Sequence, residues 1–393
     1  MSSPVMSGQV VDDGAVTRSD LDAWEAEFEN VCARFEARFY RPESRRHFRQ
    51  HMRGLLAPLE RKNGWTIAEF TGESEPKAIQ RFLNLTPRDA DALRDDVRSY
   101  AMERIADPRG VLIADPTGFA EKGKKSAGVQ RQYSGTLGRI DNCQIGTFLA
   151  YVNTMGDRVL LDRELSIPAK SWFGDPGRCA GAGVPADLTF ATRPQQVEAM
   201  IGRVLAARVP FAWFAADEES GQNPGLRAYV EGQQIAYVMA VPRDTGFTGG
   251  SGRKTVFCGL AGRLPPNAWQ RRSRGIGSKG FRVYDWALIN AGTAHHQYMI
   301  RRSTGTGELA CYHCCNPRGE SFGQLVQVAG ARWPIEECFG ASKGEAGLDH
   351  YQVRLYDAWY RHITLAMLAH TFPAVLAHQA NKGPRHLRAT SSA

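Results

Sequence analysis

The sequence has no apolar run long enough to cross a membrane. Its longest late apolar stretch, residues 363–376, is interrupted by His370, Thr371 and Pro373, and it falls short of the ~20 apolar residues that a spanning helix needs. Near the start, residues 1–16 are polar and acidic, without a cationic segment that leads into an apolar one. We therefore expect a soluble, cytoplasmic protein that has no membrane partner.

The chain also has few cysteines. Eight among 393 residues do not suggest a disulfide framework. Residues 311–315, Cys-Tyr-His-Cys-Cys, contain one Cys-x₂-Cys pair, which is half of a structural zinc site. No second Cys or His pair with matching spacing follows it, and the alternation over residues 309–314 is typical of a strand. The sequence therefore favours a strand over a zinc site.

What the sequence does contain is a surplus of positive charge. Its 49 Lys and Arg residues outnumber its 41 Asp and Glu residues, which gives a net charge of +8 and a pI of about 9.1. Such a balance favours a polyanionic partner such as nucleic acid, although many basic proteins bind none. There is no internal repeat at solenoid periods, and the length allows two or three domains with sizeable cores.

The first part of the chain reads as a tail followed by helices. Residues 1–17 are small and polar without periodicity, which predicts a disordered tail. Residues 18–107 show helical periodicity, beginning with Leu21 and Trp24. Within them, residues 66–83 predict a helix-turn-helix, which can either place its second helix in a DNA major groove or serve only as part of a helical bundle. We therefore predict a helical, candidate DNA-binding domain over residues 18–107.

The rest of the chain alternates between strand and helix. Residues 108–242 mix apolar runs with amphipathic segments, and residues 321–380 return to helix around Pro334, which together predict an α/β fold with some antiparallel hairpins. Between them, residues 243–320 hold glycine-rich turns, short β-like pieces and a basic group. The members of this group are Arg271, Arg272, Arg274, Lys279 and Arg282. We predict a β-rich insertion at 243–320 that splits one α/β domain, and a flexible basic tail at 381–393.

Two apolar runs each end in an aspartate. They precede Asp115 and Asp217, and short apolar runs of this kind predict buried strands, at whose carboxyl ends ligand sites gather in open α/β sheets. Downstream, a predicted helix carries Glu336 in its first turn and Lys343 seven residues later on the same face, with Arg332 just before it.

These residues suit divalent cations that act on phosphodiesters. Mg²⁺ prefers oxygen ligands and keeps several waters, and two such ions can activate the attacking oxygen and stabilise the leaving one. We therefore predict that Asp115, Asp217 and Glu336 are catalytic residues that hold Mg²⁺, for which Mn²⁺ can substitute.

Each of these acids also has a purely structural explanation. Asp115 precedes Pro-Thr-Gly, a turn sequence, Asp217 opens an acidic helix start, and a lone Glu336 is usually solvated. A basic cluster follows the first aspartate and either neutralises phosphates or is a solvated charge run. It consists of Lys122, Lys124, Lys125 and Arg131.

Three blocks of the sequence carry a resemblance to a known family. They are residues 115–124 together with 131–135, residues 216–227, and residues 332–351. These blocks resemble those of DDE transposases of bacterial insertion sequences, within the IS-four-like superfamily and its IS-seven-oh-one family. The similarity runs from about residue 59 to residue 370.

The resemblance implies a fold and an activity. It implies a ribonuclease-H-like catalytic core interrupted by a β-rich insertion, and Mg²⁺-dependent cleavage and strand transfer at the inverted-repeat ends of an insertion sequence. The partners it implies are double-stranded DNA, both terminal repeats and target, and a second copy of the chain in a synaptic complex at the nucleoid. Carried over, Asp115, Asp217 and Glu336 are the metal ligands. Arg332 and Lys343 are then the basic companions in the signature Tyr-x₂-Arg-x₃-Glu-x₆-Lys.

Two positions depart from the family pattern. Ala329 stands where the signature has tyrosine, and Ser220 stands where the family often has tyrosine. A catalytically inactive or domesticated DNA-binding protein therefore stays open, as does a structure-selective ribonuclease-H-like nuclease. In the insertion, Trp269 and Trp286 are either candidates to stack on a flipped base or core residues.

Overall fold

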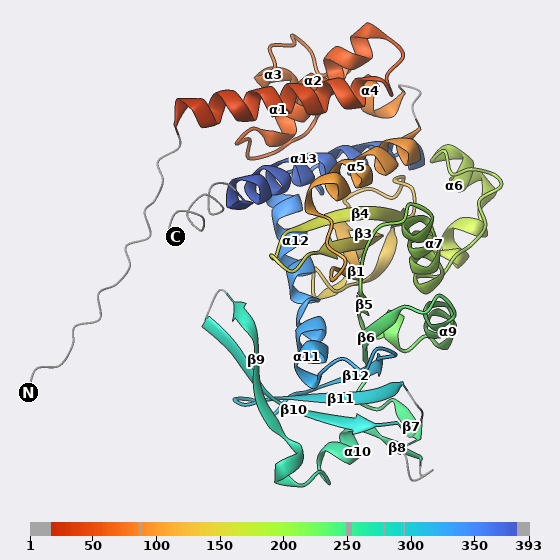
Figure 1. The fold of residues 1–393 in the computed structure, drawn as a ribbon. Coiled ribbons are helices and arrows are strands. Elements are labelled where there is room, and N and C mark those ends of the chain that lie inside the picture. Colours follow the sequence, from red (N-terminus) through yellow and green to blue (C-terminus); the bar gives the residue numbers. More distant parts are fainter. Residues whose placement is uncertain are drawn as a thin grey trace, which may run out of the picture.

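The computed structural model describes residues 17–85, 89–248, 254–277, 280–291, 293 and 295–382. It is a mixed α/β protein built on one large mixed sheet (Figure 1). The predicted tails therefore lie outside the described residues, apart from Thr17, Asn381 and Lys382, and so does Lys279. The elements in chain order are α1 (Arg18–Glu36), α2 (Pro42–Leu56), α3 (Gly64–Phe70), α4 (Lys77–Asn84), α5 (Ala90–Ile105), β1 (Val111–Ala120), β2 (Gln130–Ser134), β3 (Arg139–Val152), β4 (Arg158–Leu165), η1 (Ala169–Phe173), α6 (Pro176–Gly181), α7 (Arg193–Ala206), β5 (Trp213–Ala216), α8 (Glu218–Gly221), α9 (Pro224–Gly232), β6 (Ala236–Val241), β7 (Gly246–Thr248), β8 (Lys254–Val256), α10 (Phe257–Ala261), η2 (Pro266–Ala268), β9 (Gln270–Gly277), β10 (Gly280–Asn290), β11 (His296–Ser303), β12 (Leu309–Cys315), α11 (Phe322–Gly330), α12 (Trp333–Gly344) and α13 (Tyr356–Lys382).

The centre of the large sheet is parallel and its two sides are antiparallel. Its strands follow the order β2-β3-β1-β5-β6-β12-β11-β10-β9, and β4 pairs with β3 off this path. Strand β5 is parallel to both β1 and β6, whereas β3 and β12 are antiparallel to their neighbours. The four residues of β5 and the six of β6 are all buried, as expected where helices cover both faces of parallel strands.

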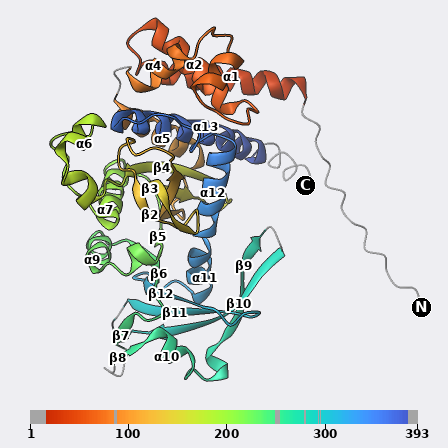
Figure 2. The same ribbon diagram turned by 180° about the vertical axis from the view of Figure 1, so that it is seen from behind.

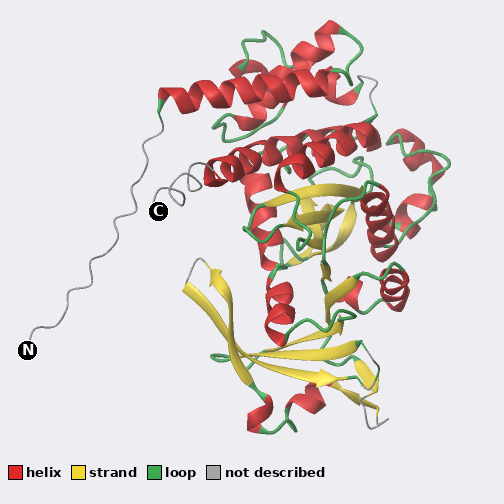
Figure 3. Cartoon of the chain, viewed as in Figure 1, coloured by secondary structure: helices red, strands yellow, loops and turns green. Residues whose placement is uncertain are grey.

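The segment predicted as a β-rich insertion does consist largely of strands. Strands β9 to β12 continue the large sheet beyond β6, whereas β7 and β8 form a separate two-stranded sheet (Figure 3). Residues 311–315 pair with β6 along their length, so this cysteine segment is a strand, as the alternation predicted.

Helices pack on both faces of β1 and β3. Successive residues of a strand point to opposite faces. On one face, Thr147 of β3 donates a hydrogen bond to Gln196 of α7 over 2.8 Å. On the other, the ring of Phe148 lies 5.5 Å from Phe339 of α12 and 6.5 Å from Trp359 of α13. Figures 1 and 2 show α12 and α7 on opposite sides of these strands.

The N-terminal helices form a layer over α13 (Figures 1 and 2). Helix α5 packs along α13 and against β4, and α3 and α4 pack on α2. The predicted pair of helices over residues 66–83 is present as α3 and α4. In α1 the buried stripe begins at Phe28, because Leu21 and Trp24 are 54% and 39% exposed. Of the helices that the structure describes, α13 included, none is long and apolar enough to cross a membrane.

Two predictions about local structure are wrong. The Pro-Thr-Gly sequence after Asp115 is not a turn: β1 continues through Pro116 to Ala120, because these residues pair with β3, with Pro116 opposite Thr147. Proline is tolerated there because β5 ends at Ala216, which leaves that side of β1 without a partner strand. Helix also resumes earlier than Pro334, since α11 begins at Phe322.

Candidate active site

Asp115 and Asp217 lie side by side at the point where two parallel strands separate. The last paired residues of β1 and β5 are Ala114 and Ala216, so each aspartate directly follows the last paired residue. Asp217 does follow a strand end, as predicted, whereas Asp115 lies in the middle of β1. Neighbouring strands are ~4.8 Å apart, so the pairing alone brings the two carboxylates together.

Asp217 also begins a short helix. Its side chain accepts a hydrogen bond from the backbone N–H of Ser220 at 2.9 Å, as the N-cap of α8. Gly221 closes this helix against β6, where a Cβ atom would lie 1.9 Å from the carbonyl oxygen of Ala240. The close approach fixes α8, and with it the backbone of Asp217.

Helix α12 brings Glu336 to the same place. Phe148, on which Phe339 of α12 packs, is directly opposite Asp115 in the β1–β3 pair. Glu336 precedes Phe339 by three residues and therefore lies on a neighbouring part of the same helix side. Glu337 points elsewhere, because its carboxylate pairs with Arg158 of β4 at 2.8 Å.

The three acids line one cavity. Its volume is about 690 Å³, and its walls include Asp115, Asp217, Glu336, Arg332 and Lys343. The acids come from β1, the end of β5 and α12, so residues more than a hundred positions apart in sequence meet here. The structure thus brings together five residues that the sequence singled out.

The carboxyl group of Asp115 is electrostatically strained. Its pKa is raised to about 7, chiefly by burial and further by the charges of Asp217 and Glu336, whereas Arg332 opposes the increase. The Nη2 atom of Arg332 lies 3.9 Å from Oδ1 of Asp115. A buried carboxyl group whose pKa is raised further by two neighbouring acids marks a site at which an added cation would be stabilised.

The donors in the cavity suit a hard cation. They are carboxylate oxygens, which Mg²⁺ prefers, and Mg²⁺ needs only one or two carboxylates besides waters and substrate phosphates. Among the described residues, no three His, Cys, Asp or Glu side chains lie close enough together to hold an ion by themselves. The geometry therefore fits a cation held by Asp115 and Asp217 together with substrate, rather than a closed protein cage.

Lys343 joins α12 to β1. Its Nζ donates hydrogen bonds to Oγ1 of Thr117 at 2.8 Å and to the carbonyl oxygen of Gly118 at 3.0 Å. It also lies 5.3 Å from the ring centroid of Phe119. Burial lowers the pKa of Lys343, while the charge of Asp349 opposes the decrease.

The other predicted DNA contacts whose side chains the structure describes do not line this cavity. Lys124, Lys125 and Arg131 are exposed, and Lys122 borders a separate groove of about 1030 Å³.

In the β9–β10 hairpin, Arg271 pairs with Asp285 at 3.0 Å, and the guanidinium carbon of Arg272 lies 4.9 Å from the ring centroid of Phe322. The side chain of Arg274 is outside the described residues, like Lys279.

Sequence reasoning did not identify Arg193 and Glu219. They line the same cavity and form an ion pair at 2.9 Å. Burial raises the pKa of Glu219, and the charge of Arg193 opposes the increase. The only signal for Glu219 was its position two residues after Asp217. Nothing in the pattern connected it with Arg193, which lies at the start of α7.

The structure places the two tryptophans of the insertion and Ala329. Trp286 is fully buried and stacks on Tyr312, with ring centroids 5.9 Å apart. It is therefore a core residue. The guanidinium carbon of Arg302 lies 4.0 Å from the ring centroid of Trp269. Ala329 is buried in α11.

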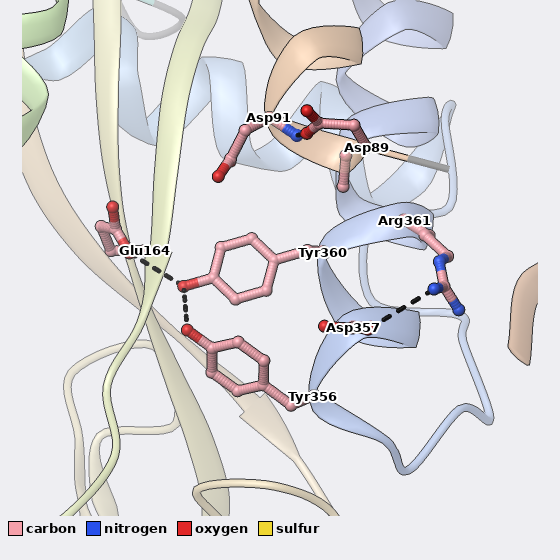
Figure 4. A pocket seen from close by; sticks show the side chains of 8 residues that line it. Asp89, Asp91, Glu164, Tyr356, Asp357, Tyr360 and Arg361 are labelled. Atoms are coloured by element: carbon pink, nitrogen blue, oxygen red, sulfur yellow. Dashed lines mark hydrogen bonds and ion pairs between the residues drawn. The ribbon is translucent and has the colours of Figure 1, made fainter. Parts of the chain in front are cut away.

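A second, smaller cavity of about 280 Å³ also has acidic walls (Figure 4). Its acids are held by protein partners: Glu164 accepts a hydrogen bond from the hydroxyl of Tyr360 at 2.8 Å and pairs with Arg203 at 2.6 Å. Asp91 pairs with Arg163 at 2.7 Å. These ion pairs connect α5, β4 and α7 and give the cavity a structural explanation.

Comparison with known proteins finds similarity to a family, to a relative and to a solved structure. Residues 34–270, more than half of the chain, match the family described as DDE superfamily endonuclease. Over 89 residues the chain is 34% identical to the probable transposase for insertion sequence element IS701 from Microchaete diplosiphon, and the match spans 23% of each protein. A solved piggyBac transposase synaptic complex with hairpin DNA has a TM-score of 0.46 at 9% identity, over 86% of this chain and 66% of that one.

Proposed function

Because this chain belongs to the DDE superfamily of endonucleases, we propose that it is a transposase that cuts and joins DNA at the ends of an insertion sequence. The observation that carries the proposal is the cavity in which Asp115, Asp217 and Glu336 meet Arg332 and Lys343. Similarity to an insertion-sequence transposase over part of the chain supports this choice of substrate.

The fold proposed for the catalytic part is ribonuclease-H-like. In support of it, the antiparallel strands β4 and β3 are followed in the sheet by the parallel strands β1, β5 and β6. In this proposal residues 108–242 and 321–380 form the catalytic domain, residues 243–320 are inserted into it, and residues 18–107 contact DNA.

The residues of the cavity divide the chemistry between them. Asp115 and Asp217 would hold Mg²⁺ together with substrate, and Glu336 on α12 would complete the site once DNA is bound. The metal would activate the attacking oxygen and stabilise the leaving one. Arg332 and Lys343 contact the phosphate and hold it in line with the attacking oxygen.

Two successive displacements follow at phosphorus. In the first, the oxygen of water forms a bond to phosphorus, the bond to the 3′-oxygen breaks, and that oxygen takes a proton. In the second, the oxygen of the freed 3′-hydroxyl loses its proton and forms a bond to a phosphorus of target DNA. The bond from that phosphorus to the target's 3′-oxygen breaks, and that oxygen takes a proton. Joining two element ends to one target requires both ends together, which a homodimer would provide.

The positions of Ala329 and Ser220 favour an active enzyme over a protein that only binds DNA. Ser220 is buried and donates its backbone N–H to Asp217, and serine in place of tyrosine leaves this bond intact. Ala329 is a buried residue of α11. Neither residue removes an acid or a cation from the cavity.

The test is Mg²⁺-dependent nicking of a plasmid that carries the gene with its flanking genomic DNA. Asp115→Asn and Asp217→Asn should each lower the rate by at least ~10³-fold, because several kcal/mol of charge stabilisation at the metal site is lost. Glu336→Gln should also lower the rate. Its neighbour provides the matched control: Glu337→Gln should retain activity, since Glu337 pairs with Arg158. Full activity of Asp115→Asn or Asp217→Asn would exclude the assignment.

A further inference from the structure

Tyr133 is an exposed aromatic residue on the wall of the active-site cavity. It lines the cavity with the acids, yet 63% of its surface is accessible. Its direct partner across the β2–β3 hairpin is Ile140, which is 59% exposed. Residues directly opposite in antiparallel strands point to the same face, so two apolar side chains stand together beside the cavity.

The hairpin that carries Tyr133 is fixed to β1. The hydroxyl oxygen of Thr136 lies 3.1 Å from that of Thr117 and 3.2 Å from the backbone nitrogen of Gly118. Ser134 approaches Gly118 so closely that a Cβ atom at residue 118 would lie 2.1 Å from its Oγ. Tyr133 is therefore held at a set position relative to Asp115, which is two residues from Thr117.

A structural role does not explain why residue 133 has an aromatic side chain. Aromatic side chains stabilise a fold by being buried, whereas most of Tyr133 faces solvent. Among the residues that the structure describes, no other aromatic ring packs on it and no group hydrogen-bonds to its hydroxyl. Single exposed apolar residues are common, but this one lies in the cavity that holds the catalytic acids.

The size and charge of the surroundings indicate what the ring meets. A cavity of about 690 Å³ is the size of a small-molecule site, with room for a nucleotide unit rather than a duplex. Arg131 is exposed and lies two residues from Tyr133, on the same side of β2 and ~7 Å away along the strand. A ring and a cation at this spacing can contact a base and its backbone phosphate.

We propose that Tyr133 stacks on an unpaired base next to the scissile phosphate and so positions the DNA strand for cleavage. This inference rests on the proposed function, because it takes DNA as the substrate of the cavity. Inside a duplex, both faces of each base are covered by the neighbouring bases. The ring of Tyr133 can therefore stack only on a base that has left the duplex stack. Stacking on a phenyl ring does not require the hydroxyl, and hence Phe should replace Tyr.

The experiment combines a residue change with a base change. Duplexes that contain the element boundary from the DNA flanking the gene are made with a normal base or an abasic site on either side of the cleaved phosphate. Cleavage is measured for wild type, Tyr133→Ala and Tyr133→Phe, with Met155→Ala as a control because Met155 is 55% exposed in the turn between β3 and β4. On the normal duplex, Tyr133→Ala should lower the rate by about 10- to 100-fold, and Tyr133→Phe and Met155→Ala should not.

The abasic duplex separates stacking from a structural role. If Tyr133 stacks on the missing base, wild type and Tyr133→Ala should cleave this duplex at the same rate. A loss of equal size on both duplexes would overturn the inference, as would equal rates for wild type and Tyr133→Ala on the normal duplex.

A second readout does not depend on cleavage. The duplex carries 5-iodouracil as the base next to the cleaved phosphate, and it is bound to the protein with Ca²⁺ in place of Mg²⁺. The complex is then photo-crosslinked, and the linked peptide is identified by mass spectrometry. A crosslink at Tyr133 without cleavage in Mg²⁺ would support the inference and overturn the proposed transposase. Cleavage without a crosslink at Tyr133, and without a Tyr133→Ala effect, would overturn the inference alone. Absence of both would overturn both.

Discussion

Lys343 donates a hydrogen bond from Nζ to Oγ1 of Thr117 over 2.8 Å and thereby joins α12 to β1 two residues beyond Asp115. Glu336 lies about two turns away on the same side of α12. The Lys343–Thr117 contact therefore sets the position of Glu336 along β1. It connects the third acid of the cavity to the strand that carries the first.

Removing the acceptor of this bond should weaken catalysis. Thr117→Val keeps the size of the side chain but leaves Lys343 with only the carbonyl oxygen of Gly118. Hydrogen bonds to charged groups contribute ~1.5–3 kcal/mol, so Mg²⁺-dependent cleavage should fall by ~10- to 100-fold. Thr189→Val, at an exposed loop position, is the control. An unchanged rate for Thr117→Val would show that the contact does not position Glu336.

Metal binding at the cavity should depend on pH near neutrality. Burial, with Asp217 and Glu336, raises the pKa of Asp115 to about 7. Only the carboxylate is a ligand, so below pH 7 protons compete with Mg²⁺, and the apparent affinity should fall by up to ~10-fold per pH unit. Above pH 7 the affinity should be constant.

Arg332 provides a check on the sign of this effect. Its charge lowers the pKa of Asp115, so Arg332→Gln should raise that pKa and move the midpoint of Mg²⁺ binding to higher pH. Titration calorimetry between pH 5.5 and 8.5 measures both midpoints. A flat profile for wild type, or a midpoint that moves to lower pH in Arg332→Gln, would contradict this account.

The approach of the β2–β3 hairpin to β1 should tolerate no side chain at Gly118. Gly118→Ala places a Cβ atom 2.1 Å from Oγ of Ser134 and 3.0 Å from its Cβ. The hairpin must move, at a cost of ~1–3 kcal/mol in the free energy of unfolding, and cleavage should fall because Tyr133 moves with it. Adding Ser134→Gly removes both atoms and should restore stability and activity. Failure of the double variant to recover would place the effect elsewhere.

The ionic network beside the smaller cavity should determine stability rather than catalysis. Asp162 of β4 is fully buried and contacts Nε of Arg203 at 2.7 Å and Nη1 of Arg94 at 3.2 Å. Asp162→Asn leaves buried guanidinium groups without this charge, which typically costs ~3–5 kcal/mol. Denaturant unfolding measures the loss. The control Glu75→Gln, in an exposed pair with Lys77, should change stability by less than ~1 kcal/mol. A similar effect in both variants would refute the network's role.

Local patterns predicted much of the fold. The apolar run before Asp217 appears as β5, and the predicted pair of helices over residues 66–83 appears as α3 and α4. Both could be predicted because burial on one or both faces of an element leaves a hydrophobic period in its sequence. Turn chemistry was less reliable. The Pro-Thr-Gly sequence after Asp115 is typical of a turn, but pairing with β3 holds it extended.

The sequence by itself determined which side chains were available for chemistry: two aspartates after apolar runs, and a glutamate and a lysine at helical spacing. Only the tertiary structure decided which of them share a cavity. Sheet pairing places Asp115 beside Asp217, the packing of Phe339 on Phe148 brings in α12, and the cavity also takes in the Arg193–Glu219 pair. The reason is that periodicity reports burial within one element, whereas convergence depends on contacts between elements that are distant in the chain.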